Sequence, residues 1–296
     1  PAAENVGGNT PGRQTGFGNS PGTGYGNPLA ATSQCEVVNM YRDPTLTTRG
    51  NPFCTFDSNA FVGLIPKTEG TALTGNFAFG ITDSLEAFAD VLYSRNIVTQ
   101  RFQPSPLRRS FMITDAQFAV QGVEPALIIR PTNPNYALAA AYLTAQGGAA
   151  AALVGQPLAV TARVFDFGDR TQEDTSTQSR LSLGLRGSFA GQEWEVAATQ
   201  NSNKLAGTVP DGYFSQVAFA RVVNSPTSDY NPWSLTQSAA FNTALAASGA
   251  KYTGSSLDAK SESTSVDARL TGDLLTLPAG PLQYAAGVQA RQESFV

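Results

Sequence analysis

Apolar and polar residues alternate along three pairs of segments in this chain, and a very short turn joins the two segments of each pair. The turns are Thr82-Asp83-Ser84, Ala190-Gly191-Gln192 and Pro278-Ala279-Gly280-Pro281. Over residues 181–189, leucine, glycine or phenylalanine fills every odd position, and serine, glycine or arginine fills every even one. A period of two is typical of a strand with one apolar and one polar face. The pattern predicts three β-hairpins, at about residues 62–102, 157–203 and 259–296.

Long polar connections separate the predicted hairpins. They cover roughly residues 1–61, 103–156 and 203–258. Short turns at one end of the strands and long loops at the other are the layout of an outer-membrane β-barrel, whereas a soluble β-sandwich places long loops at both ends. Residues 1–61 are rich in glycine, asparagine and proline and too polar to form a core alone, so we expect an extracellular loop. In the second connection, alanine-rich residues 136–146 predict a helix with Asn133 or Asn135 as its cap.

Charged residues keep to one face of the predicted strands. They are Arg180, Arg186, Asp267, Arg269, Asp273, Arg291 and Glu293, and the opposite face has none over the same stretches. An arginine or lysine on the lipid face at mid-bilayer costs about 2–4 kcal/mol, so a lipid-facing row must lack charge. A soluble sheet packed on a core lacks charge on one face as well. Aromatic residues beside the short turns favour lipid, because they fit an interfacial girdle. They are Phe77, Phe79, Phe189, Trp194 and Tyr284.

The fold class that these patterns predict is all-β, a segment of an antiparallel transmembrane β-barrel with long extracellular loops. Only about six strands can be read, whereas single-chain bacterial barrels start at about eight. Two open edges in lipid would leave backbone groups unpaired at several kcal/mol each. We therefore expect a section of a larger barrel, or one that other chains close. The start at Pro1, without a signal peptide, is what we expect of a processed chain or of a piece of a longer one.

Composition excludes several kinds of chemistry. The 296 residues include no histidine, so neither a Ser-His-Asp site nor a Cys-His site can form, and the commonest zinc ligand is missing. We expect no enzymatic activity, no bound metal and no cofactor. The net charge of -4 gives no reason to expect a nucleic-acid partner. Charged residues make up 14% of the chain, and this low share also fits a barrel whose outer face contacts lipid.

The two cysteines, Cys35 and Cys54, both lie in the first polar connection, without the spacing of a CxxC motif. We interpret them as a disulfide that ties this loop together, which implies an oxidising compartment. Two free thiols are the alternative.

Several segments together resemble TonB-dependent outer-membrane receptors. They are LEAFAD at 85–90, YSR at 93–95, RVFDFGDR at 163–170, SRLSLGLRGSF at 179–189 and LPAGPLQ at 277–283, the last followed by a strand that ends in RQES at 291–294. No single phrase is diagnostic, and the resemblance rests on their order and spacing over roughly residues 62–296. It implies a barrel of about 22 strands, closed by an N-terminal plug.

The resemblance also implies a function. Such receptors in the outer membrane of Gram-negative bacteria bind a scarce nutrient, such as a siderophore or a sugar, and import it with energy transmitted by the TonB protein through the plug. Implied partners are outer-membrane lipid and lipopolysaccharide, TonB and a small nutrient ligand. The chain shows no plug domain, no energy-coupling box near its start and no complete set of strands. A passive porin, a surface β-barrel adhesin and a soluble β-rich module that binds polysaccharide are the alternatives.

Some loop and strand residues are candidates for binding. Loop aromatics can stack on a sugar or an aromatic siderophore, or only pack the loops; we name Tyr136, Tyr213, Tyr230 and Trp233. Arg108 and Arg109 can attract an anionic ligand or a lipopolysaccharide phosphate. Pairs of carboxylates recur on the strands, at Glu86 with Asp90, Glu193 with Glu195 and Asp267 with Asp273. We interpret them as charges in a wet lumen rather than as acid–base pairs. An acidic cluster at Asp166, Asp169, Glu173 and Asp174 is a solvated strand extension or, alternatively, a calcium site.

Overall fold

The protein is mostly β and divides into two compact units, each of which is described by itself. The computed structural model describes residues 2–8, 26–48, 51–107, 122–123 and 126–296. The loop unit consists of Pro1–Leu64, Arg101–Thr171 and Val209–Gly254, and the sheet unit of Ile65–Gln100, Gln172–Thr208 and Ser255–Val296.

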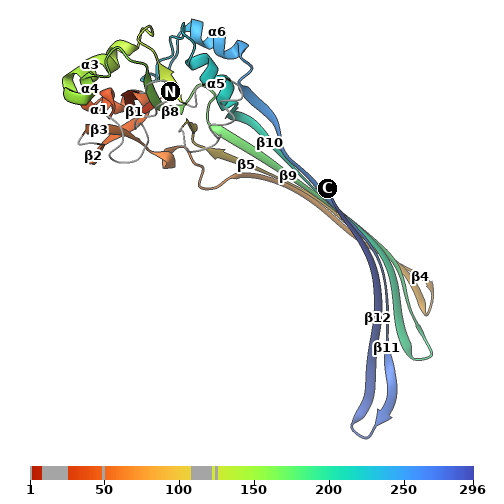
Figure 1. Cartoon of the computed structure of the whole chain (residues 1–296). Coiled ribbons are helices and arrows are strands. Elements are labelled where there is room, and N and C mark those ends of the chain that lie inside the picture. Colours follow the sequence, from red (N-terminus) through yellow and green to blue (C-terminus); the bar gives the residue numbers. More distant parts are fainter. Residues whose placement is uncertain (1, 9–25, 49–50, 108–121, 124–125) are drawn as a thin grey trace. The chain divides into compact units, whose positions relative to one another are not determined.

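Six long strands form one antiparallel sheet (Figure 1). In chain order they are β4 (Lys67–Thr82), β5 (Leu85–Phe102), β9 (Arg170–Phe189), β10 (Gln192–Phe214), β11 (Lys251–Leu277) and β12 (Gly280–Phe295). Their order in the sheet is β12-β11-β10-β9-β5-β4, so the three hairpins lie side by side. The prediction of about six antiparallel strands is confirmed. Closure into a barrel stays a prediction.

Strand register puts the apolar positions on one face of this sheet. Phe77 is opposite Ala89 in the first hairpin, and Ala268 is opposite Val288 in the last. Directly opposite residues in an antiparallel pair share a face, because successive side chains alternate between faces. The other face carries the intervening polar residues, as where Asn76 is opposite Asp90.

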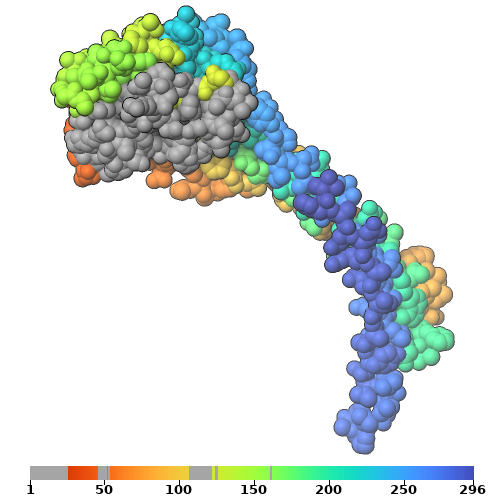
Figure 2. Space-filling model, viewed as in Figure 1, coloured from red at the N-terminus to blue at the C-terminus, as the bar shows by residue number. Residues whose placement is uncertain are grey.

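The apolar face of the sheet unit is exposed. Phe77 is 64% exposed, Leu183 51% and Val288 71%. Figure 2 shows the part of the sheet near the short turns as a thin layer. Contiguous apolar surface of this kind marks a site that meets lipid or another molecule. The described part of the sheet unit thus needs an apolar partner that it does not itself contain.

The loop unit contains short strands and the helices. Its strands are β1 (Ala2–Gly8), β2 (Met40–Thr48), β3 (Asn51–Phe56), β6 (Ser105–Leu107), β7 (Leu127–Ile129) and β8 (Leu158–Val164). β8 pairs with β1, β6 and β7, while β2 and β3 form a separate hairpin. The helices are α1 (Pro28–Ala31), α3 (Tyr136–Gln146), α4 (Gly148–Ala151), α5 (Gln216–Val223) and α6 (Ala239–Ala247), with 3-10 turns η1 (Cys35–Val38) and η2 (Ser58–Ala60). None of the helices in the described ranges is both long and apolar enough to cross a membrane.

Helix α3 has the predicted bounds, Tyr136–Gln146, and Asn135 holds its N-cap position. The side chain of Asn135 does not cap the helix. Instead, the backbone N–H of Asn135 donates to Oδ1 of Asn133 at 2.7 Å, and the Asn133 amide donates to the carbonyl of Tyr230 at 3.0 Å. The helix start is therefore fixed to a distant part of the loop unit.

Cys35 and Cys54 form the predicted disulfide, with a Cα–Cα distance of 5.4 Å. It joins η1 to β3, and both cysteines are buried in the core of the loop unit. Leu29, Val38 and Met40 are buried in the same core. The described parts of residues 1–61 therefore contribute to a core that they share with later segments, although their composition is too polar to form one alone.

Stacked aromatic rings fill the centre of the loop unit. The Phe167 and Phe214 ring centroids are 4.3 Å apart, and Phe219 contacts both rings edge-on. Tyr230 packs against Phe219 and is fully buried, and its hydroxyl has no hydrogen-bond partner among the described residues. Burial raises the pKa of the Tyr230 hydroxyl well above its usual value. By contrast, the Tyr136 hydroxyl donates to the carbonyl of Gln156 at 2.7 Å and accepts from the Gly155 N–H at 2.9 Å.

These two tyrosines give a matched pair of substitutions. Tyr230→Phe removes an unpaired buried hydroxyl and should leave the free energy of unfolding unchanged or raise it by about 1 kcal/mol. Tyr136→Phe leaves the Gly155 N–H and the Gln156 carbonyl without their partner and should lower it by about 1–2 kcal/mol. Denaturant unfolding followed by aromatic fluorescence measures both. Equal losses in the two variants would contradict the assignment.

The raised pKa of the Tyr230 hydroxyl also predicts that the stability of the fold depends on pH. A tyrosine whose pKa is raised by folding stabilises the fold below the unfolded pKa of about 10, and that contribution is lost as the pH rises toward the folded pKa. The stability of the natural protein should therefore fall above about pH 10, and that of Tyr230→Phe should fall less steeply.

Candidate functional site

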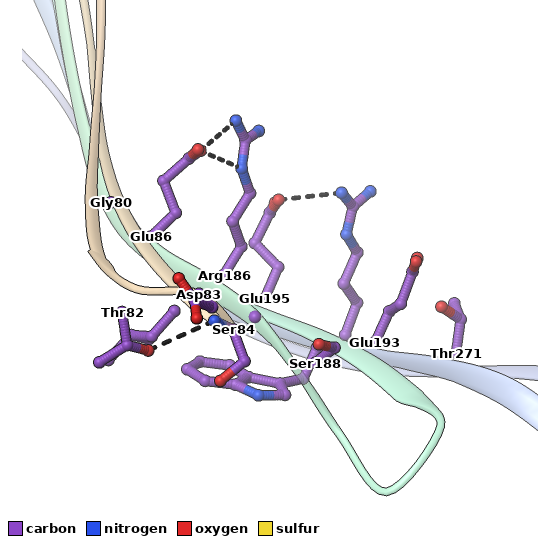
Figure 3. A pocket seen from close by; sticks show the side chains of 14 residues that line it. Gly80, Thr82, Asp83, Ser84, Glu86, Arg186, Ser188, Glu193, Glu195 and Thr271 are labelled. Carbon is purple, nitrogen blue, oxygen red and sulfur yellow. Dashed lines mark hydrogen bonds and ion pairs between the residues drawn. The ribbon is translucent and has the colours of Figure 1, made fainter.

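An open hollow lies in the sheet unit beside the short turns, with a volume of about 540 Å³. Its walls come from β4, β5, β9, β10 and β11. Figure 3 shows Glu86, Arg186 and Glu195 projecting from the same side of the ribbon. The side chains that line the hollow are mostly polar or charged, so we take this polar face as the candidate functional site.

Charges of alternating sign cross this face in one row. Nε of Arg186 donates to Oε1 of Glu86 at 2.7 Å, and an Nη of Arg269 donates to Oε2 of Glu195 at 2.9 Å. Following β5, β9, β10 and β11 in order, the row reads Glu86, Arg186, Glu195 and Arg269. Glycines stand at both ends of the row, since Gly80 is opposite Glu86 and Gly287 is opposite Arg269. We call these four charged residues the charge row.

A phenylalanine packs between the charges on the polar face. Phe88 breaks the alternation of apolar and polar residues in the sequence, and the structure gives the reason. A Cβ atom at Gly184 would overlap the Phe88 ring, so the ring lies where only glycine leaves space for it. The Arg186 guanidinium lies 5.4 Å from the centroid of this ring, within the range of a cation–π contact.

Other polar residues on this face form hydrogen bonds between neutral side chains or between an amide and a carboxylate. The Asn76 amide donates to Asp90 at 2.5 Å, and the hydroxyls of Ser182 and Thr199 are 2.8 Å apart. On the outer hairpin, the Gln283 amide donates to the carboxylate of Asp273 at 3.1 Å. The polar face is thus held together by contacts between neighbouring strands.

Four carboxylates of this face, Glu86, Asp90, Glu195 and Asp273, contact cations or amides. Glu86 and Glu195 are each paired with an arginine, and Asp90 accepts from an amide. This arrangement favours the interpretation as strand-pairing charges over acid–base catalysis. No cluster of three or more histidine, cysteine or acidic side chains placed to hold a metal occurs in the described part of the chain.

The acidic residues near the start of β9 are separated by their surroundings. Asp169 forms an ion pair with Arg101, and Asp174 accepts from the Gln172 amide at 3.0 Å. One oxygen of Asp166 is buried without a partner among the described residues, and desolvation raises the pKa of this carboxyl. These contacts favour the non-metal interpretation of the cluster.

The loop aromatics named as ligand contacts lie mostly in the interior. Tyr136, Tyr230 and Trp233 are buried in the core of the loop unit, whereas Tyr213, on β10, is partly exposed. Burial favours packing for the first three, and ligand contact stays a prediction. Arg108 and Arg109 lie outside the described residues.

Sequence reasoning named the members of the charge row but not their pairing. Glu86 and Arg186 are 100 positions apart, and their contact depends on β5 lying beside β9. One signal was present, because a glycine in a strand often marks the place where an aromatic side chain of the neighbouring strand packs closely. Phe88 and Gly184 are such a pair.

Comparison of the chain with protein-family models, with curated proteins and with solved structures finds no match.

The packing of Phe88 on Gly184 can be tested with two glycine variants. Gly184→Ala places a methyl group against the ring and 2.7 Å from the Val196 carbonyl oxygen. We expect it to lower the free energy of unfolding by about 1–3 kcal/mol, as overpacking does. Gly80→Ala is the matched control, because it lies on the same face with no atom within 4 Å of the added Cβ. Denaturant unfolding measures both, and similar values for the two variants would refute the packing argument.

Proposed function

We propose that this chain forms part of the wall of a β-barrel in the outer membrane of a Gram-negative bacterium. Its apolar sheet face meets lipid, and its polar face lines an aqueous interior. Within that class, we propose a TonB-dependent receptor that binds a scarce nutrient, such as a siderophore or a sugar, and imports it to the periplasm.

The observation that carries the proposal is one exposed apolar face on a sheet whose other face is charged. On β9 the apolar positions run from Leu181 to Phe189, and on β4 from Leu73 to Ile81. A tilted strand needs about 9–11 residues to cross a bilayer, so these stretches have a suitable length. A sheet that packed on a core of its own would bury these side chains, yet they are exposed.

Charges on the apolar face begin where the apolar stretch of the first hairpin ends. Beyond Leu73, the next positions on this face of β4 are Thr71, Glu69 and Lys67, and Arg95 is opposite Thr71. The Lys67 ammonium lies 2.6 Å from the Glu69 carboxylate. A change from apolar to charged residues along one face is typical of a strand that passes from hydrocarbon to the headgroup layer. This pattern supports lipid and lipopolysaccharide as partners.

The receptor assignment within the barrel class rests on the sequence resemblance. The charge row supports it, since a polar lumen wall of this kind can face a plug and water. Nutrient, plug and TonB are therefore partners that we propose from the family pattern.

Nitroxide labels on neighbouring residues test the orientation of the two faces. Each pair takes one residue from each face: Phe77 with Asn76, Leu183 with Ser182, and Val288 with Gln289. For the protein in outer-membrane lipid, we expect lipid-soluble oxygen to relax labels at Phe77, Leu183 and Val288. A water-soluble nickel reagent should relax the other three. The barrel proposal fails if the nickel reagent reaches both members of each pair equally.

A second measurement separates a receptor from a passive porin. The protein encoded by the complete reading frame, inserted in a planar bilayer with potassium chloride on both sides, should show no steady conductance, because a plug closes a receptor. Stable open-channel steps would instead support the porin alternative. This outcome leaves the orientation of the two faces untouched.

A further inference from the structure

Two junctions in the six-stranded sheet have no hairpin turn. Strands β5 and β9 meet across residues 103–169, and β10 and β11 meet across residues 215–250. We call these junctions the seams. In a hairpin the length and type of the turn fix the register, whereas strands joined through a long connection have no such constraint.

Ion pairs occur at the seams. Throughout the described residues, each ion pair that joins two strands or their ends lies at a seam. At β5/β9 these are Glu86–Arg186 and Arg101–Asp169; at β10/β11 they are Glu195–Arg269, Lys204–Asp258 and Asp211–Lys251. The remaining pairs join residues two apart on one strand. Inside the hairpins, the contacts between strands are the neutral or amide ones described above.

The strands at a seam could also pair in a register shifted by two residues. A slip of one residue exchanges the faces and is excluded by the apolar pattern, but a slip of two keeps each side chain on its own face. The apolar face alone therefore cannot select the native register. Another feature of the strands must make the slipped registers unfavourable.

The charges on the polar face of β10 and β11 disfavour both two-residue slips. In the native register Glu195 is opposite Arg269, as their 2.9 Å contact shows, and Asn201 contacts Ser263 in the same register. A slip in one direction puts Glu195 opposite Asp267. A slip in the other puts Glu193 opposite Asp273. In the first slip Glu193 moves opposite Arg269, so one attractive pair is kept, but two carboxylates also come directly opposite each other. The second slip loses the arginine pair and brings two carboxylates directly opposite, and like charges in this position are destabilising.

At the seam between β5 and β9, close packing of a side chain favours the native register in addition to the charges. In the native register Arg186 pairs with Glu86, and Phe88 lies over Gly184. A slip of two residues in either direction puts Phe88 opposite Ser182 or Arg186 instead of the glycine. It also separates Glu86 from its arginine.

We propose that contacts on the polar face fix the register of the hairpins at the seams. The pairs Glu86–Arg186 and Glu195–Arg269 favour the native register, and the slipped registers are disfavoured by like charges at β10/β11 and by the fit of Phe88 over Gly184 at β5/β9. The charge row then determines which hairpins lie side by side and in which register their strands pair. This inference depends on the sheet alone and does not require the proposed transport function.

The substitution Glu195→Arg should shift the register at β10/β11. In the native register it places two arginines opposite each other. In the slip that brings residue 195 opposite Asp267, it creates an attractive pair, and Glu193 then meets Arg269. We expect the ratio of native to slipped register to fall by at least about tenfold, because the contact of residue 195 with Arg269 becomes repulsive while its contact with Asp267 becomes attractive.

Cysteine pairs report the register in the full chain. Asn201→Cys with Ser263→Cys can form a disulfide in the native register, and Asn201→Cys with Ser261→Cys in the slipped one. Mass mapping distinguishes these bonds from the natural disulfide. The first pair should dominate in the otherwise unchanged chain, and the second after Glu195→Arg. Retention of the 201–263 bond after Glu195→Arg overturns the proposal.

Two further variants keep the test decisive. Asn203→Arg adds a cation to the same face of β10 away from the row and should keep the native bond. The double variant Glu195→Arg with Arg269→Glu restores opposite charges and should also give the native bond. If Glu195→Arg yields neither bond because it does not fold, rescue of the 201–263 bond by the double variant supports the proposal. Failure of that rescue overturns it.

Discussion

The structure of the sheet unit depends on one constraint: an apolar surface on a single-layer sheet must leave water. Burying apolar area contributes roughly 25 cal/mol of stabilising free energy per Å². The apolar face exposes Phe77, Leu183 and Val288, so removing this face from water would stabilise the sheet considerably. A soluble protein would cover it with a second layer, but the described part of the sheet unit supplies none. Between strands the backbone groups pair, so only the side chains of that face and the two outer strands require a further environment.

Because a single layer has no interior, its tight packing occurs on its surfaces, where a large side chain lies over a glycine of the next strand. On the polar face Phe88 covers Gly184, and on the apolar face the Trp194 ring comes close to Gly187. Near the last hairpin, Gln192 lies over Gly272 and accepts a hydrogen bond from the Tyr284 hydroxyl. A Cβ atom at Gly184 or Gly272 would overlap the side chain above it, and one at Gly187 would overlap the Ser84 carbonyl oxygen and crowd the Trp194 ring. These glycines give the sheet specific contacts without a core.

Local features were predictable from sequence and long-range ones were not. The alternation of residues, the short turns, helix α3 and the Cys35–Cys54 bond follow from period, turn chemistry and composition. The pairing of Glu86 with Arg186 depends on which hairpins are neighbours, and no local pattern encodes that order. The interior positions of Tyr230 and Trp233 were equally inaccessible, because an aromatic in a polar connection reads the same whether it faces ligand or packs on Phe219 and Phe241.

The long connections and the seams are linked by chain order. Residues 103–169 leave β5 and return at β9, and residues 215–250 leave β10 and return at β11, so each connection begins and ends on the two strands of one seam. A two-residue slip at a seam would displace one end of its connection by about 6–7 Å, at 3.2–3.4 Å per residue. The loop core draws on both connections, through Leu143 and Val164 from the first and Phe219 from the second. The register at each seam therefore determines how far apart the two ends of its long connection lie.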